Sequence, residues 1–109
     1  MVKLKISPLA RADMRGIGDY ISRELRNPSA AQRMIRRFRE SIKPLSEFPE
    51  MGAPLLTAGK QHPPYRCLIC GSYLIFYHLS EDSVLVDRVL YGRRDYLALL
   101  FGDQLEESE

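Results

Sequence analysis

One apolar stripe restricts the fold more than any other feature of the sequence. Apolar residues recur every three or four positions in its first half: Ala31, Met34, Ile35, Phe38, Ile42 and Leu45. This spacing predicts a helix with one buried face. Pro44 predicts a bend or an end of that helix near Ile42 or Lys43. The stripe is the clearest periodic signal in the chain.

A further helix is predicted just before it. Ser7 and Pro8 suit an N-cap and a first helical position, and one face carries Met14, Ile17, Ile21 and Leu25. Asn27 and Pro28 end this helix and open the next, with Asn27 as the cap. Because the connection is so short, we expect an antiparallel helical hairpin. The alternation of apolar and basic residues over 2–6 predicts a half-buried strand before it.

The second half of the chain predicts a small sheet. Residues 48–64 are rich in proline and glycine and predict a loop of about sixteen residues, long enough to suspect a function. Three β-prone runs follow (65–69, 73–79 and 84–91), and their short connections predict an antiparallel meander. Residues 95–101 predict a short terminal helix or packed tail. The order β-α-α-β-β-β predicts an α+β fold, a helical hairpin packed on an antiparallel-rich sheet.

Length and composition fit one globular domain. The 109 residues are too few for two well-cored domains, so we expect one domain over 1–102 and an acidic, flexible tail over 103–109. No apolar run approaches the roughly 18 residues of a membrane span, and the opening residues show no signal-peptide pattern. We therefore expect a cytoplasmic protein without a membrane partner.

Charge is distributed unevenly along the chain. The net charge is +2, but residues 102–109 hold four acidic side chains and no cation. Twelve of the sixteen cations are arginine, and eight of these lie between Arg11 and Arg39. They are either the solvated faces of two helices or a surface for an acidic protein or nucleic acid.

Common catalytic and metal-binding patterns are missing from the sequence. It contains neither of the glycine-rich phosphate-binding loops. Cys67 and Cys70 form a lone CxxC on a strand, and without two further ligands we interpret them as ordinary thiols. His62 is expected to be solvated and His78 to serve packing. No metal or other cofactor is expected.

The segment 88–96 is the exception, with three arginines and two tyrosines in nine residues. Arginine and tyrosine together suit RNA, whose phosphates they neutralise and whose bases they stack. They suit a protein-binding hot spot equally well. A third explanation is that Arg88 pairs with Asp87 or Asp95 to hold the edge of the sheet.

Over about residues 2–101 the chain resembles the toxins of the RelE/ParE superfamily. The similarity rests on order and spacing, carried by Ser7-Pro8-Leu9-Ala10, Asp13, Ile17, Tyr20-Ile21, Asn27-Pro28, Ala30-Ala31, Phe48-Pro49, Gly52, Tyr65-Arg66, Gly71-Ser72-Tyr73, Tyr77 and Arg88-Val89-Leu90-Tyr91-Gly92-Arg93-Arg94-Asp95-Tyr96. The resemblance implies a growth-inhibiting toxin of the plasmid-stabilisation kind, neutralised by a cognate antitoxin that wraps around it. It also implies that operator DNA is contacted through the antitoxin complex.

The superfamily has two main branches. ParE-like members inhibit DNA gyrase, and RelE-like members cut mRNA in the ribosomal A site. The ParE-like interpretation is favoured, with gyrase or another protein as the target, because the nuclease pattern is incomplete here. The strand over 65–69 has one basic residue where RelE-like sites tend to have two lysines, and Leu74 stands where an arginine is usual.

The resemblance assigns roles to named residues. If the chain is RelE-like, the catalytic residues are Arg66, Arg94 and Tyr96, although no good base is visible. Under either interpretation, target binding is expected at Arg88, Arg93, Arg94 and Tyr96. Antitoxin binding is expected on the second helix, at Arg33, Arg36 and Arg37.

Overall fold

The computed structural model describes residues 1–55 and 65–92, and its elements follow the predicted order. The first half comprises β1 (Lys3–Ile6), α1 (Pro8–Asp19), the π-helical turn η1 (Tyr20–Glu24), α2 (Pro28–Ile42) and the 3-10 turn η2 (Lys43–Ser46). The second half comprises β2 (Ala53–Pro54), β3 (Tyr65–Cys70), β4 (Tyr73–Ser80) and β5 (Ser83–Tyr91). The predicted terminal helix and acidic tail lie outside the described residues.

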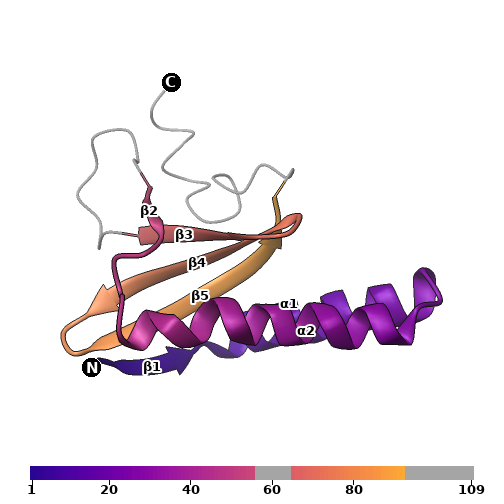
Figure 1. The fold of residues 1–109 in the computed structure, drawn as a ribbon, viewed down its shortest axis with the longest axis horizontal. Coiled ribbons are helices and arrows are strands. Elements are labelled where there is room, and N and C mark those ends of the chain that lie inside the picture. The colour runs from indigo at the N-terminus through magenta and orange to yellow at the C-terminus, as the bar shows by residue number, and fades with distance from the viewer. Residues whose placement is uncertain (56–64, 93–109) are drawn as a thin grey trace.

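The elements form two layers, with α1 and α2 side by side along one face of the sheet (Figure 1). The strand order is β1-β5-β4-β3-β2. β1 runs parallel to β5, with Lys3 opposite Ser83 and Ile6 opposite Val86, and the other pairs are antiparallel. The predicted α+β fold is confirmed, including its helical hairpin and antiparallel-rich sheet. Among the described residues, no helix has the length and apolar character needed to cross a membrane.

The helices begin where their capping residues predict. Ser7 Oγ accepts a hydrogen bond from the Ala10 amide at 2.9 Å, and Asn27 Oδ1 accepts one from the Ala30 amide at 3.1 Å. The predicted apolar face of the first helix is wrong at Leu25, which is 56% exposed. The π-helical turn η1 causes this difference, because its wider turn rotates the following residue away from the core.

The apolar stripe of α2 packs on the sheet as predicted. Its most deeply buried members are Phe38, Ile42 and Leu45. They belong to one core with side chains of the helix-facing side of β4 and β5, namely Ile75, Tyr77, Val84, Val86 and Val89. α2 ends at Ile42 and gives way to η2, in agreement with the effect predicted for Pro44.

The segment after η2 is more ordered than a proline-rich loop predicts. The Tyr77 hydroxyl donates to the Pro49 carbonyl and accepts from the Gly52 amide, both at 2.8 Å. A Cβ at Gly52 would lie 2.8 Å from the Tyr77 ring and 2.9 Å from the Cys67 carbonyl. Glycine therefore allows the close approach through which β2 pairs with β3.

Candidate functional site

A single carboxylate joins the end of β5 to α1. Asp13 Oδ2 accepts from Arg88 Nε at 2.8 Å and from the Val89 amide at 2.9 Å, while Oδ1 accepts from Arg88 Nη2 at 3.0 Å. The hydrogen bonds from Arg88 to Asp13 raise the pKa of the guanidinium. Of the alternatives given for Arg88, pairing with Asp87 is not the one formed, because its guanidinium binds Asp13; Asp95 lies outside the described residues.

The sheet needs this side chain because β1 is short. Pairing with β5 stops at Val86, so the edge of β5 beyond that residue has no neighbouring strand among the described residues. Ser7 Oγ donates to the Asp87 carbonyl at 2.9 Å, and Asp13 takes the Val89 amide. Two side chains from the start of α1 thus satisfy edge groups that would otherwise lack partners.

A groove of about 640 Å³ lies between α1 and the end of β5. Its lining is mainly apolar and aromatic and consists of Ala12, Asp13, Gly16, Ile17, Tyr20, Tyr73, Val89, Leu90 and Tyr91. Tyr73 and Tyr91 contact edge to face, with centroids 5.8 Å apart. The sequence gives no sign that these residues meet, because the groove joins three separate segments. An aromatic, apolar groove of this kind suits a protein or ligand contact.

Tyr91 of the groove lies two positions before Arg93, the first of the predicted target contacts that follow β5 in sequence. The Gly92 amide donates to the Ser72 carbonyl at 2.8 Å, which fixes the chain as it leaves β5. Arg93, Arg94 and Tyr96 follow in sequence and lie outside the described residues. Arg88, the remaining predicted target contact, has its guanidinium on Asp13.

Arg66 holds the segment before β2. Its Nη1 donates to the Gly52 carbonyl at 2.7 Å and to the Glu50 carbonyl at 3.2 Å. In the β3–β4 register Arg66 lies opposite Tyr77, the residue that binds the same segment. The described contacts of Arg66 are therefore structural.

The other face of the sheet carries a polar pair that sequence analysis missed. His78 Nδ1 lies 2.7 Å from Asp87 Oδ2, and the Tyr65 ring packs on the imidazole with centroids 5.1 Å apart. Burial raises the pKa of Asp87, and the hydrogen bond from His78 opposes that shift. Asp87 is the extra residue of β5 where Phe76 pairs with Arg88 but Tyr77 pairs with Val86. Such a bulge redirects side chains, which is why strand alternation did not predict the pair.

Cys67 and Cys70 are both free thiols. Their places in the register, opposite Phe76 and Tyr73, put them on opposite faces of the sheet. Burial raises the pKa of Cys67 to about 11. Within the described ranges, no three His, Cys, Asp or Glu side chains gather closely enough to hold a metal ion.

The arginines of the helical hairpin make no ion pair with another described residue. All eight between Arg11 and Arg39 are exposed, and none forms an ion pair within residues 1–55 and 65–92. Arg36 lines a cleft between the two helices, while a Cβ on Gly71 would lie 3.2 Å from Arg37 Nη1. Arg36 and Arg37 therefore lie on different sides of α2.

Comparison with known proteins gives one family match and a structural match. The profile described as the ParE toxin of the type II toxin–antitoxin system, parDE, matches residues 4–96. A solved structure described as the chromosomal ParDE TA system from P. aeruginosa is similar in fold, with a TM-score of 0.68 and 22% sequence identity. The match covers 84% of this chain and 96% of that chain. No match was found among curated proteins.

Proposed function

The chain belongs to the ParE toxins of type II toxin–antitoxin systems, and on that premise we propose that it inhibits DNA gyrase, or another protein target, until a cognate antitoxin neutralises it. The observation that carries the antitoxin part is the exposure of Arg33, Arg36 and Arg37 on α2, none of which forms an ion pair with another described residue. Unpaired guanidinium groups bind carboxylates through two parallel hydrogen bonds. We infer an acidic antitoxin segment.

We propose that Arg33, Arg36 and Arg37 contact this segment. Because Arg36 faces α1 and Arg37 faces the β3–β4 turn, one segment that contacts both has to pass around α2. A segment that folds on binding can cover such a surface. Operator DNA would then be contacted through the antitoxin complex.

For the target we propose the segment after β5, with Arg93, Arg94 and Tyr96 as contacts. We propose the aromatic groove beside Tyr91 as a further contact for the same target. Arg88 contributes by holding β5 against α1 through Asp13, and the proposed segment follows β5 in sequence.

Protein inhibition is favoured over the RelE-like alternative, ribosome-dependent mRNA cleavage, by the geometry of the described residues. Cleavage needs a base and cations around one phosphate. His78, oriented by Asp87, is a base that favours the alternative. However, Arg66 is opposite Tyr77 and His78 is the next residue along β4, so Arg66 and His78 lie on opposite faces of the sheet.

One induction experiment tests the target. The chain is expressed without antitoxin, and plasmid supercoiling, the SOS response and primer extension on mRNA are followed together. We expect lost supercoiling and an SOS response with intact mRNA, both relieved by Arg94→Ala. Rapid codon-phased mRNA cuts that disappear in His78→Ala or Arg94→Ala would replace the proposal with the nuclease.

A pull-down with the product of the adjacent open reading frame tests the antitoxin. We expect a stable complex that is weakened about 100-fold by reversing Arg33, Arg36 and Arg37 to glutamate, because like charges then oppose each other. The same reversal at Arg11, Arg15 and Arg23 is the control for net charge. Recovery of the tagged chain alone, without a complex, would remove the main support for an antitoxin.

A further inference from the structure

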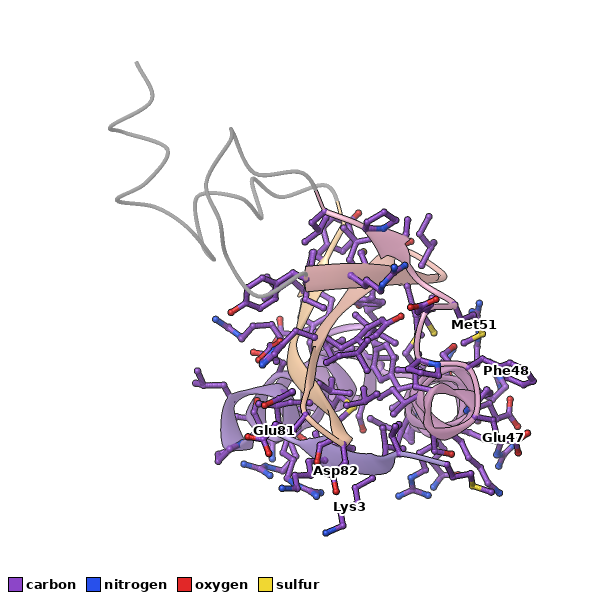
Figure 2. All side chains as sticks on the ribbon, turned by 90° about the vertical axis from the view of Figure 1, so that its left-hand side faces the viewer. Lys3, Glu47, Phe48, Met51, Glu81 and Asp82 are labelled. Atoms are coloured by element: carbon purple, nitrogen blue, oxygen red, sulfur yellow. The ribbon has the colours of Figure 1, made fainter. Side chains whose placement is uncertain are left out.

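The segment after η2 exposes apolar side chains between acidic ones. Phe48 is 60% exposed and Met51 is 46% exposed. Glu47 and Glu50 flank them and are also exposed. Figure 2 shows Glu47, Phe48 and Met51 on the outside of the molecule, beside the end of α2. We call residues 47–51 the acidic knob.

A groove of about 410 Å³ between β1, α1 and α2 has the opposite character. Its apolar lining consists of Leu4, Ile6, Met14, Ile35 and Ile42. Its remaining lining residues are all cations, namely Arg11, Arg15, Arg39 and Lys43. We call it the basic groove.

We propose that the acidic knob of one copy of this chain docks in the basic groove of a second copy. Phe48 and Met51 would cover the apolar lining of the groove and so lose their own exposure to water. Glu47 and Glu50 would meet the cations around it. The acidic knob supplies negative charge and exposed apolar side chains, and the basic groove supplies positive charge and an apolar lining.

The positions of the two surfaces favour a closed dimer. The knob begins at Glu47, four residues after Lys43 of the groove, so both surfaces lie at the same end of α2. A two-fold axis beside this end can seat each knob in the other copy's groove. Such a self-complementary interface closes at two copies and buries both contacts. Arg33, Arg36 and Arg37 are not part of either surface, so the dimer does not depend on the antitoxin proposal.

The decisive experiment exchanges charge between the surfaces. One full-length variant carries Glu47→Arg and Glu50→Arg, and the other carries Arg11→Glu, Arg15→Glu and Arg39→Glu; all five positions are exposed. Cell-free synthesis avoids toxicity, circular dichroism checks folding, and sedimentation measures association. Each variant alone opposes like charges at both contacts, whereas a mixed dimer matches opposite charges at both.

We expect the unmodified chain to form dimers that weaken when salt rises from about 0.05 M to about 0.5 M. Each variant alone should dissociate about 100-fold more readily, and an equimolar mixture should recover dimers. Phe48→Ser should weaken association about tenfold. A monomeric unmodified chain, or a mixture that stays monomeric, would overturn the proposal. Capture of the groove by an acidic peptide without self-association would assign it to another partner and overturn it equally.

Discussion

Asp13 should contribute more to stability than any other acidic residue on the described surface of α1, and Asp13→Ala tests this. The substitution removes the acceptor for Arg88 Nε, Arg88 Nη2 and the Val89 amide together. These bonds join α1 to the part of β5 that β1 does not reach. Their loss should open that edge.

The structure fixes the size of the effect. The side chains of Arg88 and Asp13 are 26% and 14% exposed, so the pair lies between two limits. An exposed ion pair contributes about 0–1 kcal/mol, whereas breaking a buried one costs about 3–5 kcal/mol. The Val89 amide also loses its acceptor, at about 1–3 kcal/mol. We expect the free energy of unfolding to fall by about 3 kcal/mol.

Urea unfolding followed by circular dichroism measures this difference. Asp19→Ala is the matched control, because Asp19 is an exposed acid on the same helix and should change stability by less than about 0.5 kcal/mol. A double-mutant cycle with Arg88→Ala isolates the ion pair from the Val89 contact and should give a coupling of about 2 kcal/mol.

Two results would refute the reasoning. The first is an Asp13→Ala effect no larger than that of Asp19→Ala, which would mean that water replaces the carboxylate without cost. The second is a coupling near zero with a large effect of Asp13→Ala alone, which would assign the stabilisation to the Val89 amide and not to the charge pair.

Two further predictions concern two glycines, Gly52 and Gly16, and the thiol of Cys67. Gly52→Ala should lower the free energy of unfolding by about 2–3 kcal/mol, because its Cβ would collide with Tyr77. Gly16→Ala should raise the free energy of unfolding by about 0.5–1 kcal/mol, because nothing lies within 4 Å of its Cβ. Thermal unfolding of both variants measures these changes. Cys67, with a pKa of about 11, should react slowly with iodoacetamide at pH 8 and about tenfold faster at pH 9, since only the thiolate reacts; a rate that is flat over this range would contradict the assignment.

Local signals explain what the sequence predicts correctly. The stripe of α2 and the caps Ser7 and Asn27 depend on residues within a few positions of one another, so periodicity and capping chemistry reveal them. The pairing of Asp13 with Arg88 spans 75 residues, and the order of the strands decides it. Asp13 is one of the residues that carry the family resemblance, but nothing near it in sequence identifies its partner.

In the candidate site, too, the contacts that the sequence does not predict join different segments of the chain. The resemblance implies a catalytic role for Arg66 if the chain is RelE-like, and its carbonyl acceptors, Glu50 and Gly52, carry no signal in sequence. His78 looked like a packing residue because a bulge brings Asp87 beside it. Backbone acceptors and bulges depend on tertiary geometry, which a single sequence does not display.

The parallel pairing of β1 with β5 also governs how the chain can fold during its synthesis. Lys3 pairs with Ser83, eighty positions later. At about 5–20 residues per second a ribosome needs roughly 4–16 s to add those eighty residues. Throughout that interval the first strand has no partner, and the α1 carboxylate that binds Arg88 is unoccupied. The pairing of β1 with β5 and the contact of Asp13 with Arg88 can therefore form only after residues 83–88 have been synthesised.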